Sequence, residues 1–92
     1  MATFLMLGRY SSEAIKGISK DRTGKVMNIV EKSSGKIKSM MALLGRYDLA
    51  FIVDFPGTKE ALKASVDIAK ITGIGFMTMP ALTVDEFDKA IG

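Results

Sequence analysis

The chain has 92 residues, carries a formal net charge of +3 and contains neither cysteine nor histidine. Those two absences exclude disulfide bonds, thiolate chemistry and a histidine base, and they leave zinc, haem and copper without their usual ligands. The length fits one domain over residues 1–92, and 48% hydrophobic with 25% charged residues is typical of a folded globular protein.

Hydropathy periodicity and turn residues predict a series of short elements. In the order strand, helix, strand, strand, helix, strand, these are residues 3–10, 12–34, 36–44, 47–55, 59–71 and 74–82, with a short terminal helix at Val84–Ile91. Ser11 or Ser12 can cap the first helical segment. Glycines weaken the middle of that segment, so we expect a break near residues 19–21, and Gly35 supplies the stop.

The second half of the chain carries clear boundary signals. Thr58 is the expected N-cap of the second long helix, and Gly73 ends it. Pro80, late in the last strand, indicates an edge position in the sheet because proline cannot donate a ladder hydrogen bond. Thr83, followed three residues later by Glu86, predicts a capping box at the start of the terminal helix.

This order of elements predicts a ferredoxin-like βαββαβ fold of the α+β class, with a four-stranded antiparallel sheet. Alternation along residues 36–44 assigns Ile37 and Met40 to opposite faces of that sheet. Alternation along residues 47–55 assigns Tyr47 to the face that carries Phe51.

Both faces of the predicted sheet are apolar. In the strand at 47–55, Phe51 and Val53 point one way while Ala50 and Ile52 point the other way. An antiparallel sheet with one wet face should instead alternate with polar residues. Since two long helices cover only one face, we expect a second copy of the chain to cover the other, and hence a homodimer or a higher homo-oligomer.

The segment Leu44–Leu49 (LGRYDL), followed by Ile52–Pro56 (IVDFP), resembles the GYD domain family. Further similar stretches are Gly8–Ser11, Gly17–Ser19, Arg22–Thr23, Lys38–Met40, Ile71–Ile74 and Glu86–Phe87. One departure is Arg46, which stands between the glycine and the Tyr-Asp pair that give the family its name. The resemblance implies a dimeric α+β barrel and carries no assigned activity with it.

A weaker likeness connects the chain with the ligand-sensing domain of the Lrp/AsnC regulators. It rests on Gly45, on Tyr47–Leu49 and on the Gly73-Ile74 pair that opens the last strand. In that family, the loop around this glycine and aspartate helps to bind an amino-acid effector between dimers. The chain has no room for a DNA-binding helix-turn-helix, so the likeness implies sensing by a stand-alone module.

The tetrapeptide Leu-Gly-Arg-Tyr occurs twice, ending the first predicted strand and following the second. In the expected topology these two strands run parallel with the third between them, so both copies reach the same end of the sheet, about 10 Å apart. Arg9, Tyr10, Arg46, Tyr47 and Asp48 would then form an anion- or carboxylate-binding rim. The alternative is solvated strand ends with an ion pair between subunits, such as an arginine with Asp48.

Three other positions allow two interpretations each. Asp54 lies in an apolar strand, where it could be an acid or base with a raised pKa, or could cap the following turn near Gly57 and Thr58. Gly8 and Gly45 are expected to serve backbone geometry, as a bulge or a positive φ.

The function these features favour is a homo-oligomeric module that binds or senses a small anionic metabolite. Alternatives are a cofactor-independent isomerase or monooxygenase-like enzyme, disfavoured by the missing histidine, or a purely structural oligomer. Residues 1–46 carry nine basic and three acidic side chains. They lack a basic run or stacking aromatics, so we expect no nucleic-acid partner. We also expect no metal, cofactor, signal peptide or membrane segment, and a cytoplasmic location.

Overall fold

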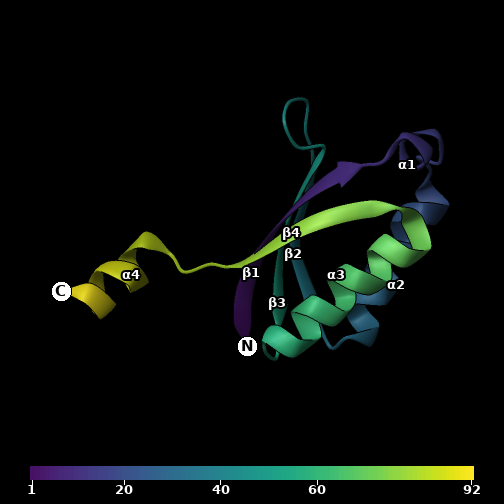
Figure 1. Cartoon of the computed structure of the whole chain (residues 1–92). Coiled ribbons are helices and arrows are strands. Elements are labelled where there is room, and N and C mark those ends of the chain that lie inside the picture. Colours follow the sequence, from purple (N-terminus) through teal and green to yellow (C-terminus); the bar gives the residue numbers. More distant parts are fainter.

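The computed structural model describes residues 1–92 and shows one sheet with both long helices on the same face (Figure 1). The four strands lie in the order β2-β3-β1-β4, and all neighbours are antiparallel. The elements are β1 (Ala2–Tyr10), α1 (Ser12–Lys16), α2 (Lys20–Lys32), β2 (Lys36–Ala42), β3 (Leu49–Phe55), α3 (Thr58–Thr72), β4 (Ile74–Pro80) and α4 (Val84–Ile91). This confirms the predicted ferredoxin-like α+β fold.

The predicted break in the first helical segment is present and separates α1 from α2. Each helix has its own serine N-cap: the Ala14 N–H donates to Ser11 Oγ (3.0 Å), and the Arg22 N–H donates to Ser19 Oγ (3.1 Å). Because a serine side chain satisfies one otherwise free N–H at each helix start, the chain can restart a helix after only three residues.

The end of α2 lies close to the predicted stop at Gly35, but the left-handed residue there is not the glycine. Ser34 takes the left-handed conformation with φ 61°, and the Gly35 N–H donates to the Val30 carbonyl at 2.9 Å. A glycine is required at position 35 because there is no space for a side chain. A Cβ there would lie 2.6 Å from Phe55 Cε1 and 2.7 Å from Val30 Cγ1, so the backbone at this turn packs directly on the core.

β2 contains an irregularity that overturns the predicted assignment of Ile37 and Met40 to opposite faces. The pairing with β3 shifts between Ile37 and Ser39, so that Lys38 is an extra residue. Ile37 and Met40 therefore both pack against the core under the helices. The bulge also turns the Lys38 side chain toward the Asp54 carboxylate of β3.

The hydrophobic core fills the space between the two long helices and one face of the sheet. Its fully buried large side chains are Met6 of β1, Phe51, Val53 and Phe55 of β3, Val30 of α2 and Ile68 of α3. α3 approaches the sheet with small residues, since Ala61 and Ala64 are buried while Leu62 and Val66 stay about half exposed. The large side chains of the core thus come mainly from the strands.

The boundary of α3 is confirmed at one end and corrected at the other. Gly73 ends the helix in the left-handed conformation with φ 77°, as predicted. Its N-cap, however, is Gly57, which makes no side-chain capping bond, and Thr58 is the first helical residue. The prediction that Thr58 is the N-cap was therefore wrong by one position.

The last strand and helix match the sequence prediction closely. β4 is an edge strand, and the capping box between Thr83 and Glu86 is formed. α4 stands apart from the rest of the molecule (Figure 1), and none of its residues is buried. None of the helices combines the length and apolar character that crossing a bilayer requires.

The glycine contacts give a stability test with a matched control. We expect Gly35→Ala to destabilise the protein by about 1–3 kcal/mol, because the new Cβ would overpack Phe55 and Val30. Gly24→Ala, inside α2 with open space around it, should instead stabilise by up to about 1 kcal/mol. Urea unfolding of both variants measures the difference, and equal effects would contradict the contact described at Gly35.

Candidate ligand-binding site

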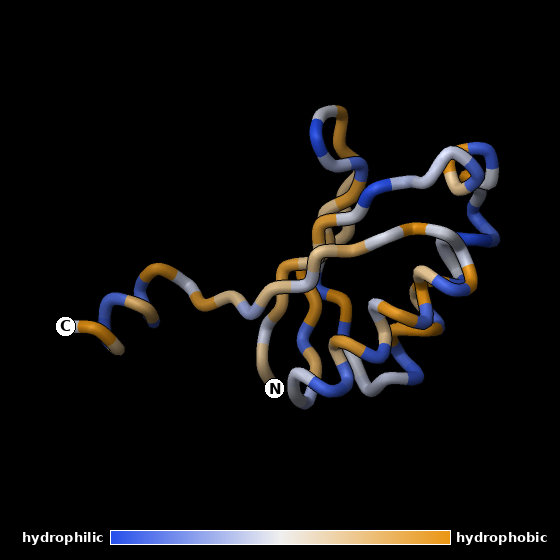
Figure 2. Tube along the Cα trace, viewed as in Figure 1, coloured by the Kyte–Doolittle hydropathy of each residue, from blue (hydrophilic) through white to orange (hydrophobic).

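The face of the sheet opposite the helices is apolar and uncovered within one chain. We call it the open face; its apolar side chains are Leu5 and Leu7 of β1, Met41 of β2, Ala50 and Ile52 of β3, and Met77 and Met79 of β4. Met41 and Met77 are about half exposed. Figure 2 shows the apolar character of the strands, with both long helices on one side.

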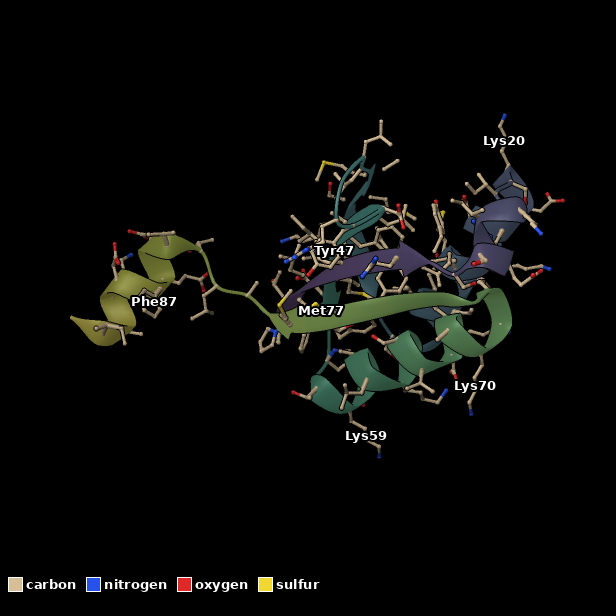
Figure 3. The ribbon with its side chains drawn as sticks, turned by 45° about the horizontal axis from the view of Figure 1, so that its top comes forward. Lys20, Tyr47, Lys59, Lys70, Met77 and Phe87 are labelled. Carbon is tan, nitrogen blue, oxygen red and sulfur yellow. The ribbon has the colours of Figure 1, made fainter.

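Three of the five predicted site residues gather at one end of the open face. Arg9, Arg46 and Tyr47, which we call the arginine rim, line a single depression of about 530 Å³. Leu7, Gly75, Phe76 and Met77 complete its wall. The Tyr47 hydroxyl donates to Met77 Sδ at 3.3 Å, and Figure 3 shows these two side chains side by side. The depression therefore combines two cations and a phenol with an apolar floor.

The topology explains why two distant copies of Leu-Gly-Arg-Tyr meet here. β1 and β2 both pair antiparallel with β3, so they run parallel and end at the same side of the sheet. The Asp48 N–H donates to the Gly8 carbonyl at 2.8 Å, and the Leu43 N–H donates to the Asp48 carbonyl at 2.8 Å. These bonds hold the loop of the second copy against the end of the first.

Neither arginine of the rim is neutralised by an acidic side chain. The ion pairs within 4 Å in this chain are Lys38–Asp54, Lys63–Asp67 and Lys89–Asp85. Arg9 and Arg46 take part in none of them, and both are exposed. Two positive charges at one depression repel each other, so an anion placed between them would be attracted to both.

The other two predicted site residues lie outside the depression. Tyr10 faces the helix-covered side, where the Arg22 guanidinium stacks 5.2 Å from its ring centroid. The Asp48 carboxylate accepts the Tyr10 N–H at 2.8 Å, and so ties the two tetrapeptide copies together. Within one chain, both residues therefore support the arginine rim through this hydrogen bond and do not line the depression.

Two predictions about this region were wrong. Tyr47 lies on the open face and not on the face of Phe51, because β3 begins only at Leu49 and alternation does not reach back to Tyr47. Of the two roles predicted for Gly8 and Gly45, a positive φ is absent at both, and the pairing of β1 continues through Gly8 without a bulge. Gly8 is instead required for space, since a Cβ there would lie 2.6 Å from Phe76 Cε1.

Asp54 plays neither of the predicted roles. Its carboxylate accepts a 2.6 Å hydrogen bond from Thr3 Oγ1 and pairs with Lys38 Nζ at 3.5 Å, on the open face and away from the following turn. The Thr3 hydrogen bond, helped by the Lys38 charge, lowers the pKa of Asp54 despite its partial burial. Within one chain, this shift is opposite in direction to the raised pKa that the acid–base interpretation of Asp54 requires.

The fold defines the chain as a ferredoxin-like α+β domain with one uncovered, apolar sheet face. The chain belongs to the GYD domain family, whose profile matches residues 4–91. No curated protein matches it significantly. Among solved structures, a homoserine dehydrogenase from Thiobacillus denitrificans is similar over 86% of this chain, with a TM-score of 0.57 and 16% identity. The chain spans 17% of that protein's chain, so the likeness shows the fold alone.

The lowered pKa of Asp54 predicts a specific dependence on acid. Its contribution to stability is complete above the unfolded-state pKa of about 3.9 and is lost as the pH falls through the lower folded-state value. Thr3→Val removes the hydrogen bond that contributes most, so the pKa of Asp54 should rise in this variant. Carboxyl-carbon NMR titration of both proteins checks this, and an unchanged pKa would show that the Thr3 bond does not matter.

Proposed function

We propose that this protein is a homo-oligomeric module that binds a small anionic molecule at the arginine rim. The observation that carries the proposal is the convergence of Arg9 and Arg46, from two separate parts of the chain, on one depression with no acidic partner. Guanidinium groups bind carboxylates and phosphates through paired, charge-assisted hydrogen bonds. Tyr47 adds a hydroxyl that can donate to the same anion.

The rest of the wall restricts the kind of ligand. Leu7, Phe76 and Met77 give the depression an apolar side next to the two charges. The depression, of about 530 Å³, is shallow and open to solvent within one chain, so a small molecule could enter it. A small carboxylate or phosphate ester with an apolar portion matches this combination better than a bare inorganic ion, which would leave the apolar wall in water.

The oligomeric part of the proposal follows from the open face. An uncovered face rich in leucine, isoleucine and methionine is costly to leave in water, and a second copy of the chain offers an apolar surface of the same kind. Because the arginine rim lies at the end of this face, a partner packed on the sheet would shield the depression from solvent. Lower exposure to water strengthens the attraction between an arginine and an anion.

Thermal unfolding with a panel of amino acids, small carboxylates and phosphate esters tests the proposal. A ligand at one hundred times its Kd stabilises by about 2.7 kcal/mol, which raises the Tm of a chain of this size by on the order of 10 °C. Arg46→Ala should abolish the shift. Lys70→Ala is the control, since it also removes one positive charge but lies on α3, away from Tyr47 (Figure 3).

Two outcomes contradict the proposed site. One is a panel in which no anion raises the Tm of the wild-type protein. The other is a shift of equal size in wild type, Arg46→Ala and Lys70→Ala, which would place any binding elsewhere on the surface.

A further inference from the structure

The C-terminal segment, residues 81–92, projects from the molecule and exposes an apolar stripe. We call this segment the arm. Val84, Phe87 and Ile91 of α4 follow the i, i+3, i+7 spacing that places side chains on one side of a helix. Their exposed fractions lie between 54% and 75%, and Figure 3 shows Phe87 far from the sheet. Within one chain, this stripe contacts nothing that could cover it.

A helix of this kind needs a surface to pack on. α4 has eight residues, and isolated helices shorter than about 12–15 residues are only marginally stable in water. Its local signals are nevertheless strong: the capping box at Thr83 is formed, and Lys89 Nζ lies 3.2 Å from Asp85 Oδ2 one turn away. The sequence thus specifies an amphipathic helix whose stability depends on burying its apolar side.

α4 points away from the sheet of its own chain (Figure 1). The Ala81 N–H donates to the Thr3 carbonyl at 2.9 Å, which fixes the arm at the end of the sheet where β1 begins. Only residues 81–83 separate β4 from α4, and three residues span at most about 11 Å. α4 therefore starts beyond the last residues of the strands and continues away from them (Figure 1).

We propose that the arm is exchanged between two copies of this chain, with the stripe of Val84, Phe87 and Ile91 packed on the open face of the partner. This inference rests on the homo-oligomer of the proposed function and adds the element that joins the copies. The open face and the arm adjoin, because Leu5 and Ile52 share a depression of about 390 Å³ with Leu82, with Lys38 and Glu86 at its polar side. Each copy thus offers both the stripe and its receptor, as a twofold interface requires.

Charge and area support this choice of partner. α4 carries three acidic residues and one basic residue, whereas the exposed Lys36 on the open face has no ion-pair partner within its own chain. Four strands about 4.8 Å apart and about seven residues long give that face a footprint of roughly 450 Å². A stable interface covers about 800 Å² on each partner, which is more than the footprint of the open face alone. An exchanged arm adds its own apolar stripe to the surface that each copy buries.

Sedimentation over a range of concentrations, with a pair of matched variants, tests the exchange. The wild-type protein should form a dimer of twice the 9.9 kDa of one chain. Phe87→Ser, which removes the half-exposed ring and leaves the core intact, should raise the dimer dissociation constant at least tenfold. Lys89→Ser introduces the same residue on the opposite side of α4 and should change that constant by less than about threefold.

Isotope-filtered NMR on a dimer mixed from labelled and unlabelled chains identifies the surface that receives the arm. We expect contacts from the Phe87 ring of one chain to the methyl groups of Ile52, Met77 or Met79 of the other. Contacts found only within one chain, or none at all, overturn the exchange.

The possible failures are distinguishable. A wild-type protein that stays monomeric overturns both the exchange and the oligomeric part of the proposed function. A dimer that Phe87→Ser leaves unchanged overturns the exchange alone. In either case, the Arg46-dependent rise in Tm reports separately on anion binding.

Discussion

The two crossover connections place α2 and α3 on the same side of the sheet, and this shared side determines which face of the sheet is left for binding (Figure 1). The core closes between those helices and the strands, with Phe51, Val30 and Ile68 fully enclosed. The other face receives no helix from the same chain. Its leucine, isoleucine and methionine side chains are therefore left without a covering layer within one chain, and both the ligand site and the exchanged arm depend on that face.

The two copies of Leu-Gly-Arg-Tyr show how one tetrapeptide can present its side chains in two ways. The first copy lies in β1, where alternation sends Arg9 to the open face and Tyr10 to the helix-covered face. The second copy lies in the loop before β3, where alternation does not apply, so Arg46 and Tyr47 both reach the depression. The arginine rim depends on this difference. If the second tetrapeptide also lay in a strand, alternation would direct its arginine to the depression and its tyrosine to the opposite face.

Local signals were sufficient to predict the element order, the sheet topology, a first cap at Ser11 or Ser12, the cap at Thr83 and the stop at Gly73. The errors arose where a long-range contact decides the outcome. The sequence around Lys38 is compatible with regular alternation and gives no sign of a bulge. Only the pairing with Phe51 and Val53 of β3 shows that Lys38 is the residue without a partner. In the site, the topology predicted that Arg9 and Arg46 lie at the same depression. The positions of Tyr10 and Asp48 outside it depend on a hydrogen bond between residues 38 positions apart, which the sequence does not reveal.

The same distinction between local and long-range information explains the arm. Its capping box and apolar spacing are complete within residues 83–91, so the sequence alone predicts a helix with one side to bury. The sequence of residues 83–91 does not specify the surface on which the apolar side of this helix packs. The backbone path gives part of the answer: the Ala81 N–H donates to the Thr3 carbonyl, which holds the start of the arm against β1, and α4 then points away from the sheet. Because α4 points away from its own sheet and none of its residues is buried, its apolar side is free to pack on an identical chain, as the proposed exchange requires.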